Sequence, residues 1–543
     1  VYSLSLAVYC TSWTFFGAVG QAAEQLWAFL PIYLGPVLLL IFAPWVLQKM
    51  VLISKQQNIT SIADFIAARY GKSQTLAVVV ALICLVGVLP YIALQLKGIV
   101  LGVNLLIGAN ADATGTRVQD TALVISLVLA LFAIVFGTRS LDVTEHHRGM
   151  VLAIAFESLI KLLAFLAVGI FIVFNLYDGF DDLFSQARQS IHLQDYWKET
   201  INWPSMVVQT AVAMMAIICL PRQFHVTVVE NIEPQDLRLA RWVFPMYLAL
   251  AALFVVPIAL AGQMMLPGTV ISDSFVISLP LAEAHPSLAL LAFIGGASAA
   301  TGMVIVEAVA LSTMVSNDML LPWLLRRNNA ERPFEAFRHW MLSVRRVTIV
   351  VILLLAYVSY RLLGSTASLA TIGQIAFAAV TQLTPAMLGA LYWKQANRRG
   401  VFAGLAAGIF LWFYTLVLPI AAHSLGWSLQ LFPGLAWLHG NPLNLPISPL
   451  TQGVVLSLAG NFTLFAWVSV LSRTRVSEHW QAGRFIGQQT SARPSSKPLL
   501  AVQIDDLLTL ASRFVGEERA RQSFIRFAYR QGKGFNPNQN ADG

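Results

Sequence analysis

The sequence predicts an all-α integral membrane protein, because three properties of its composition agree. Of the 543 residues, 57% are hydrophobic and only 11% are charged, and the mean hydropathy is +0.69. Soluble domains carry roughly 25% charged residues, so this chain has too few charges to cover a water-facing surface of its size. Helices and closed barrels alone satisfy the backbone within a bilayer. The composition therefore excludes a soluble enzyme or a nucleic-acid-binding domain.

Twelve apolar segments meet, or nearly meet, the length of about 20 helical residues that a bilayer core about 30 Å thick requires. We number them as spans one to twelve. In chain order they cover residues 4–20, 26–47, 76–107, 121–136, 150–176, 206–220, 242–266, 288–314, 347–363, 371–392, 401–423 and 453–471. These segments predict a helical bundle that fills most of the chain.

Basic residues predict the orientation of this bundle, since short loops rich in Lys and Arg stay in the cytoplasm. The loops after spans two, four, six, eight and ten hold most of them, whereas the alternate loops hold Arg117, Arg188, Lys198 and Arg361. The first set of loops and the tail after residue 471 are therefore expected inside. The net charge of +8 then reflects orientation rather than a polyanion partner. Residue 1 lies almost within a helix, so we expect a further span or leader before it.

The segment after the twelfth span has a different composition. Residues 472–498 are rich in Ser, Arg and Pro, which predicts a solvated linker. Residues 499–543 place apolar residues at helical spacing among charges and predict a small helical module. A core of about 40 residues is marginal by itself, so the module is expected either to pack on a neighbour or to belong to a larger cytoplasmic region. The cysteines Cys10, Cys84 and Cys219 lie in apolar segments without metal-ligand spacing, so neither a disulfide nor a metal site is predicted.

Three segments resemble motifs of the sodium:solute symporter family. They are SIADFIAARYG at 61–71, YIALQL at 91–96, and QLTPAMLGALYWK at 382–394 followed by Gly400 and Gly404. The resemblance covers residues 1–471 and implies the LeuT-type fold, in which spans one to five and six to ten form two halves related by inversion. Spans eleven and twelve would be peripheral, and one family helix would precede the core.

A closer resemblance is to a fused subtype, the CbrA-type sensor histidine kinases. It rests on FGTRSLDVTEHHRG at 136–149, on AFESLIK at 155–161, and on 507–527, which is similar to a STAC module. The resemblance implies a multi-pass protein of the bacterial inner membrane that takes L-histidine. It also implies sensory and kinase domains beyond residue 543 and a response regulator as partners. No catalytic motif is found in the chain, although the full-length parent would be a histidine protein kinase.

A solute site is expected at mid-membrane, where spans one and six of this fold break. Thr11, Ser12, Thr14, Gly17 and Gly20 allow the first span to unwind, and Pro221 ends the sixth. The resemblance aligns Tyr91 with a position that faces the solute. The candidate solute-binding residues are Tyr9, Ser12, Trp13, Tyr91, Gln95, Met214 and Ile217. The alternative is that aromatic and Met residues at helical spacing serve packing alone.

Sodium coupling is doubtful on the residues that the resemblance aligns. The family's sodium site uses a Ser/Thr pair on the eighth span, and here Gly302 and Met303 occupy those positions. Ser298 and Thr301 lie close by but would need a shift in register. Tyr9 also replaces an acidic residue that the family has on the first span. No cofactor is predicted.

Protons are the alternative coupling ion, because ionisable residues within a span are costly and usually functional. The candidates are Glu307 on span eight and the pair Glu157 and Lys161, which share one face of span five. For that pair a structural ion pair is the competing interpretation. At the predicted inner side, Glu145 matches an acidic family position and Arg222 belongs to a loop that could act as a gate.

Two functions remain open at this point. One is a proton-coupled importer of an amino acid, with L-histidine as the expected solute, whose terminal module relays occupancy to a kinase. The other is a receptor that binds solute through a transporter fold but has lost transport. The altered ion site is compatible with both.

Overall fold

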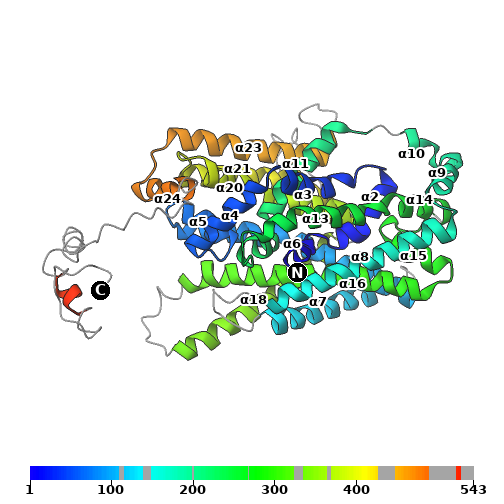
Figure 1. Ribbon diagram of the computed structural model, residues 1–543, viewed down its shortest axis with the longest axis horizontal. Helices are drawn as coiled ribbons and strands as arrows, with labels where there is room; N and C mark the ends of the chain where they lie inside the picture. The colour runs from blue at the N-terminus through cyan, green and yellow to red at the C-terminus, as the bar shows by residue number, and fades with distance from the viewer. Residues whose placement is uncertain are drawn as a thin grey trace. The chain divides into compact units, whose positions relative to one another are not determined.

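The computed structural model describes residues 1–108, 115–137, 148–198, 201–266, 268–322, 334–363, 368–425, 447–487 and 521–526. Over these residues the chain is helical and contains no strand (Figure 1). The chain separates into two units, Val1–Gly487 and Gln488–Gly543. In the second unit the described residues, 521–526, are helical; the rest of the predicted module at 499–543 lies outside the described residues.

The predicted spans are present as apolar helices. Within the part of the chain that the structure describes, eight segments are long and apolar enough to cross a membrane, and two bent helix pairs each supply one more span. The eight are formed by α6 (Gln74–Ile107), α8 (Arg148–Phe171), α13 with α14 (Asp236–Leu253, Val255–Met265), α16 (Pro286–Met314), α18 (Phe334–Leu363), α19 with α20 (Leu369–Val380, Thr384–Tyr392), α21 with α22 (Arg398–Trp412, Leu418–Leu425) and α23 (Pro449–Leu471). The broken first span and α7 (Gly115–Gly137) account for the other two predicted spans.

Two spans bend at prolines. Span two consists of α3 (Leu30–Phe42) and α4 (Pro44–Gln57), which meet at 74°, and span six of α11 (Trp203–Cys219) and a segment Pro221–Val229, which meet at 56°. Proline lacks the N–H that a continuing helix needs and forces the preceding residue out of the helical region. The prediction that Pro221 ends the sixth-span helix is confirmed, whereas the sequence analysis did not foresee the bend at Pro44.

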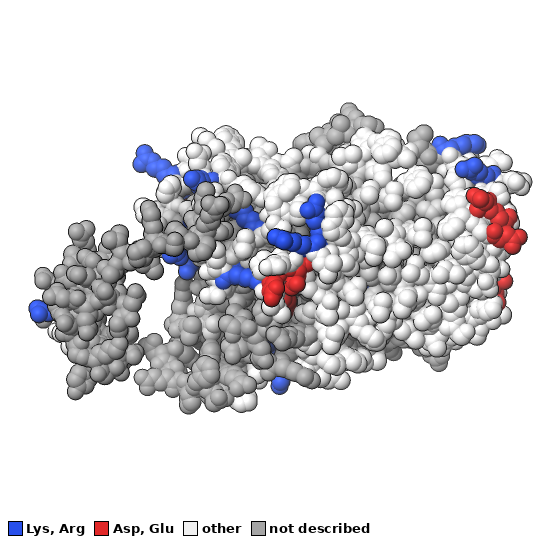
Figure 2. Space-filling view, in the orientation of Figure 1, with Lys and Arg blue, Asp and Glu red and all other residues white. Residues whose placement is uncertain are grey.

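Short helices mark the two ends of the bundle. At one end lie α9 (Phe180–Gln189), α10 (Gln194–Lys198) and α15 (Phe275–Ala282), and at the other lie α5 (Ile62–Arg69) and α24 (Val476–Ile486) (Figure 1). On the face that Figure 2 shows, charged side chains gather in two groups with a broad uncharged surface between them. That arrangement suits a bundle whose middle lies in lipid. From the loop charges, the end with α5 and α24 is called the predicted inner end, and the other the predicted outer end.

Helix α24 lies within the segment for which composition predicted a solvated linker. It forms because one of its faces is apolar enough to be buried: Phe485 is fully buried and Ala482 nearly so. The helix packs on α5 and α20. Its charged residues concealed this face in the average composition of residues 472–498.

Spans eleven and twelve pack closely on each other through small residues. Helix α21 faces α23 with Gly400, Gly404 and Gly408. A Cβ atom at residue 404 would come 2.5 Å from the Asn461 Oδ1 atom and 2.8 Å from the Phe465 Cβ atom. Small residues that let helix backbones approach are the usual basis of helix association in membranes.

The substitution Gly404→Ala should therefore destabilise the bundle by about 1–3 kcal/mol, the usual cost of overpacking a core. The measurement is the midpoint of thermal unfolding in detergent. Gly460→Ala on α23 is the matched control, because its Cβ atom would meet only the mobile end of Leu411. Equal midpoints for the two variants would contradict the close packing of α21 on α23.

Candidate functional site

The first span is broken in its middle, as the sequence predicted. Its inner part is α1 (Tyr2–Ser5) and a 3₁₀ turn at Leu6–Tyr9, and its outer part is a π-turn at Trp13–Gly17 and α2 (Ala18–Glu24). Between them Cys10 is extended, with φ −77° and ψ 113°. The Thr14 hydroxyl replaces lost helix bonds, since it accepts from the Thr11 N–H and donates to the Thr11 carbonyl, both at 2.9 Å.

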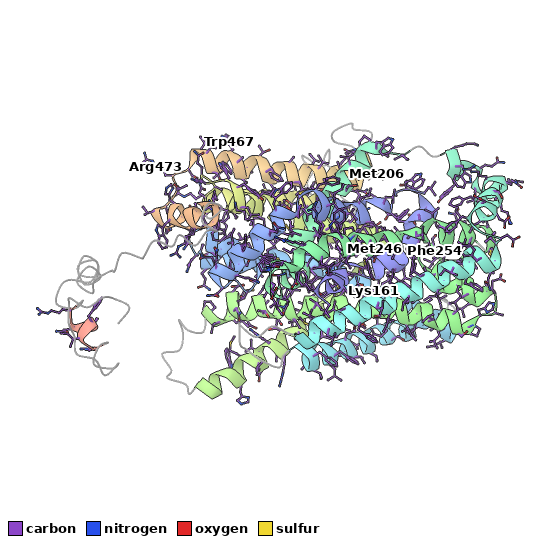
Figure 3. All side chains as sticks on the ribbon, in the orientation of Figure 1. Lys161, Met206, Met246, Phe254, Trp467 and Arg473 are labelled. Carbon is purple, nitrogen blue, oxygen red and sulfur yellow. The ribbon has the colours of Figure 1, made fainter. Side chains whose placement is uncertain are left out.

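Lys161 binds two carbonyl groups at this break, of which the Ala7 carbonyl also accepts from the Cys10 N–H at 2.9 Å. Its Nζ atom donates to the Ala7 carbonyl at 2.6 Å and to the Cys10 carbonyl at 2.7 Å. The side chain comes from α8 and is buried, and Figure 3 places it well inside the bundle, away from both ends. A backbone carbonyl without a partner costs several kcal/mol in hydrocarbon. The ammonium group therefore stabilises the broken form of span one.

Glu157 lies one turn from Lys161 but makes a different contact. Its carboxylate approaches α16 at Gly302, where any side chain would collide with the Glu157 oxygen atoms. The Ser298 hydroxyl donates to the Glu157 carbonyl at 3.2 Å, and the Thr301 hydroxyl donates to the Ser298 carbonyl at 3.3 Å. Among the described residues, no ion pair within 4.0 Å joins Glu157 to Lys161. The two side chains thus join span five to span eight and to span one respectively.

Residues of span three hold the outer side of the break. The Gln95 Oε1 atom accepts from the Ser12 N–H at 2.9 Å, and the Gln95 Nε2 atom donates to the Tyr91 carbonyl at 3.1 Å. The hydroxyl groups of Tyr91 and Thr11 are 3.0 Å apart. The Ser12 hydroxyl has no hydrogen-bond partner. Gln95 and Tyr91 therefore fix the conformation of span one at the predicted solute position.

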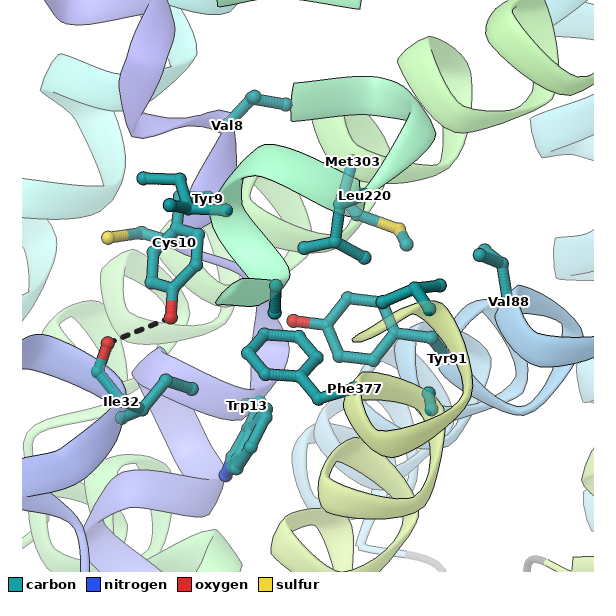
Figure 4. Packing of buried hydrophobic residues seen from close by; sticks show 14 of the residues in the cluster. Val8, Tyr9, Cys10, Trp13, Ile32, Val88, Tyr91, Leu220, Met303 and Phe377 are labelled. Atoms are coloured by element: carbon teal, nitrogen blue, oxygen red, sulfur yellow. Dashed lines mark hydrogen bonds between the residues drawn. The ribbon is translucent and has the colours of Figure 1, made fainter. Parts of the chain in front are cut away.

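Four aromatic rings meet at the centre of the bundle (Figure 4). Phe377 of α19 lies 5.0 Å from Trp13, 5.6 Å from Tyr91 and 6.1 Å from Tyr9, measured between ring centroids. The Tyr9 hydroxyl donates to the Ile32 carbonyl at 2.8 Å, a bond drawn in Figure 4. The Trp13–Phe377 contact is edge-to-face and the other two are tilted, and offset or edge-to-face rings at such separations attract one another. The cluster joins spans one, three and ten beside the break of span one.

A buried ion pair lies on the predicted inner side of the aromatic cluster. The Arg222 Nη1 atom of α12 (Pro221–Phe224) lies 2.9 Å from the Glu307 Oε2 atom of α16, and both side chains are fully buried. The guanidinium also lies over the Tyr91 ring, 4.5 Å from its centroid. Arg222 is thus a membrane residue at the break of span six and not part of an exposed loop. It links spans three, six and eight.

A pocket with an empty volume of about 430 Å³ lies between the aromatic cluster and the predicted outer end. Trp13 and Phe377 border it, together with the amide side chains of Gln209 and Gln374. The indole N–H of Trp13 has no hydrogen-bond partner, although the side chain is 97% buried. The residues that line the pocket include Gln21 and Thr451 but none with a formal charge. The pocket therefore offers uncharged donors and acceptors beside an aromatic wall.

The predicted solute-binding residues divide into three groups. Trp13 borders the pocket, whereas Tyr9, Ser12, Tyr91 and Gln95 lie at the break of span one behind it. Met214 and Ile217 do not line the pocket, because α11 turns Val208, Gln209, Val212 and Ala213 toward it instead.

Sequence reasoning missed Phe377, Gln209 and Gln374. The two glutamines could have been found from the sequence, because each places a polar amide side chain within an apolar span.

Glu145, the other predicted gate residue, lies outside the described residues. The other gate candidate, Arg222, is described and forms the ion pair with Glu307.

Comparisons with known proteins show the family of this chain. The sequence profile of the sodium:solute symporter family matches residues 1–408. The chain belongs to the sodium:solute symporter family. An uncharacterised symporter of Bacillus subtilis (strain 168), YhjB, is 24% identical over 419 residues, which are 75% of this chain and 79% of that protein.

Solved structures place this symporter in the LeuT-type fold. A Na⁺-coupled sialic acid symporter, solved in a substrate-bound outward-open state, superposes with a TM-score of 0.62 at 14% identity over 87% of this chain and 90% of its own. Mhp1, a nucleobase-cation-symport-1 family transporter, gives a TM-score of 0.45 at 13% identity over 89% and 95%. The superposition on the sialic acid symporter confirms the predicted fold class.

Removal of Arg222 from the symporter tests the buried ion pair. Breaking a buried pair by removing one partner typically costs about 3–5 kcal/mol, because a buried charge loses its compensation. Arg222→Met should therefore lower the thermal unfolding midpoint strongly, and the double variant Arg222→Met/Glu307→Met should recover most of the loss. The measurement is thermal unfolding of the three proteins in one detergent. Additive losses in the double variant would show that the two charges do not stabilise each other.

Proposed function

We propose that this symporter imports an amino acid, with L-histidine as the solute, and that it couples uptake to protons rather than to sodium. One observation carries the proposal: the Lys161 ammonium binds the Ala7 and Cys10 carbonyls at the break of span one. Sodium requires several oxygen ligands, and these two oxygen atoms are already bound by a fixed cation. The opposite residues, Gly302 and Met303, have no side-chain oxygen.

The chemistry of lysine makes this arrangement a coupling device. An ammonium and a sodium ion carry the same charge, but a buried lysine can release its proton and rebind it. Loss of the proton removes the positive charge that holds the two carbonyls. The inner half of span one is then free to move relative to α8. A small cavity borders Lys161 and is lined in part by Cys10, Thr14 and Tyr247, which supports access of water.

Glu157 and Glu307 take different parts in the proposal. Glu157 is the proton exchange partner of Lys161, because it is one turn away on the same helix and lies against Gly302 without a cationic partner within 4.0 Å. Glu307 acts in the inner gate, because its charge is compensated by Arg222. Ser298 and Thr301 position the Glu157 turn against α16.

The pocket beside Trp13 supports a small polar solute. An amino-acid zwitterion carries no net charge, and the pocket lining is uncharged. The indole N–H of Trp13 and the amides of Gln209 and Gln374 provide hydrogen-bonding groups, and the rings of Trp13 and Phe377 provide a wall on which an imidazole can stack. The choice of L-histidine rests on the similarity of residues 136–149 and 507–527 to the CbrA-type sensor histidine kinases.

The same similarity supports a sensory role. In this proposal the transporter is the membrane part of a two-component sensor in a bacterial inner membrane, and the tail after span twelve is cytoplasmic. The partners are kinase domains and a response regulator. The second candidate is a solute receptor without transport, which the tight aromatic cluster at the centre of the bundle favours.

Uptake of labelled L-histidine by proteoliposomes tests the coupling. An inward pH gradient should drive accumulation, whereas a sodium gradient at equal pH should not. Lys161→Met should abolish accumulation and retain histidine binding, because Lys161 does not line the pocket. Lys97→Met, in span three, is the matched control and should transport normally. Accumulation driven by sodium alone would overturn proton coupling, and tight binding without accumulation under either gradient would establish the receptor.

Trp13→Phe tests the pocket. The variant retains an aromatic ring but loses the unpartnered indole N–H, so histidine affinity should fall by roughly 2- to 10-fold, as expected for a hydrogen bond worth about 0.5–1.5 kcal/mol. The measurement is equilibrium binding of labelled L-histidine to the detergent-solubilised protein. Val208→Ala, which changes the pocket wall without removing a donor, should have a smaller effect. Equal affinity of Trp13→Phe and the unmodified protein would exclude the indole N–H as a ligand.

A further inference from the structure

Helix α24 binds the predicted inner end of the transporter through one face. Four residues separate it from the end of α23, so it directly follows the last span. Glu478, Gln481, Ala482 and Phe485 form the buried face. On the other face Val476 and Trp480 are 88% and 61% exposed. The helix therefore contacts the transporter through this one face, while its other face is exposed.

A row of three aromatic rings connects α24 to the broken sixth span. The Phe485 ring lies 5.4 Å from the Phe65 ring of α5, and the Phe65 ring lies 5.8 Å from the Phe224 ring of α12. Both contacts are edge-to-face, with an interplanar angle of 75° between Phe485 and Phe65 and of 71° between Phe65 and Phe224. All three side chains are buried. Displacement of Phe224 would thus remove the support on which Phe65, and in turn Phe485, packs.

Polar contacts fix the first turns of α24 at the same surface. The Glu478 Oε2 atom accepts from the Arg398 N–H at the start of α21, at 3.4 Å. Gly71, whose φ of +80° lies in the left-handed region, brings the loop after α5 against Glu478, and a Cβ atom there would lie 3.1 Å from the Glu478 Cγ atom. The Arg69 guanidinium bonds the Trp393 carbonyl at 2.9 Å. The surface therefore combines the loops after spans two and ten.

The aromatic row ends beside the centre of the transporter. Phe224 is two residues from Arg222, which pairs with Glu307 and lies over the Tyr91 ring. The Gln223 side chain between them donates to the Leu6 carbonyl of span one at 3.4 Å. A movement of α12 therefore changes the packing of the solute region and the support of Phe65 together.

We propose that the surface formed by α5 and α20, which α12 supports through the Phe224–Phe65 contact, is a docking site for α24. Helix α24 binds this surface while α12 is packed against α16 and leaves it when α12 shifts. Release of α24 then reports the state of the broken spans to the residues after Gly487. By linkage, binding of α24 must stabilise the packed α12 to the same extent. The proposal does not depend on the identity of the solute or of the coupling ion.

Hydrogen–deuterium exchange of the full chain in detergent tests the forward direction without any solute. Phe224→Ala should accelerate exchange of the α24 amides by at least about fivefold, the lower limit of typical coupling between linked sites. Phe254→Ala is the matched control: Phe254 is also a buried ring, stacked on Phe180 and far from α24 (Figure 3). Unchanged exchange in Phe224→Ala, or an equal increase in Phe254→Ala, would overturn the proposal.

Cysteine labelling tests the reverse direction. Val228→Cys places a thiol on η5 (His225–Val229), in the inner half of span six, at a position that is 2% exposed. Phe485→Ala should increase its rate of labelling by a water-soluble maleimide by at least about fivefold. Val476→Ala, on the exposed face of α24, should leave the rate unchanged. If Phe485→Ala fails to fold, Phe485→Leu removes the ring but retains an apolar side chain. Equal rates with intact and altered Phe485 would refute the linkage.

Discussion

A helix that is interrupted in the middle of a bilayer must satisfy the backbone groups it exposes, and this requirement organises the whole transporter. At the break of span one, carbonyl groups bind the Lys161 ammonium, and the Ser12 N–H binds the Gln95 side chain. These partners come from spans five and three. The break thus ties the two spans to the first, and neither could shift without leaving a polar group unpaired in an apolar interior.

The buried charges follow from the same constraint. Lys161 is stabilised by carbonyl dipoles, and Arg222 by Glu307 and the face of Tyr91. Each cation lies at one of the two broken spans, where the backbone is not fully used by its own helix. A charge held in this way is a poor source of net stability, because desolvation offsets most of the attraction.

The two ends of the bundle are closed to different extents. Toward the predicted outer end, a pocket reaches Trp13 and Phe377 between spans one, two, six, ten and twelve. Toward the predicted inner end, the Arg222–Glu307 pair, the row of phenylalanine rings and α24 fill the space. A family of transporters needs such asymmetry, since access must alternate between the two sides. In this chain the inner closure includes a segment that follows the last span.

The sequence by itself determined the spans, the class of fold and the positions of both breaks. Hydropathy, the Thr–Ser–Gly content of residues 11–20 and Pro221 are local properties, and local properties decide where a helix runs and where it stops. The tertiary structure decided which side chains meet. Lys161 was matched to Glu157 by helical spacing, yet its bonds go to span one. Likewise Arg222 was assigned to a loop, Phe377 was missed, and α24 was concealed in a linker composition. These contacts join segments 60 or more residues apart, so they depend on how helices pack across the bundle, which no local pattern records.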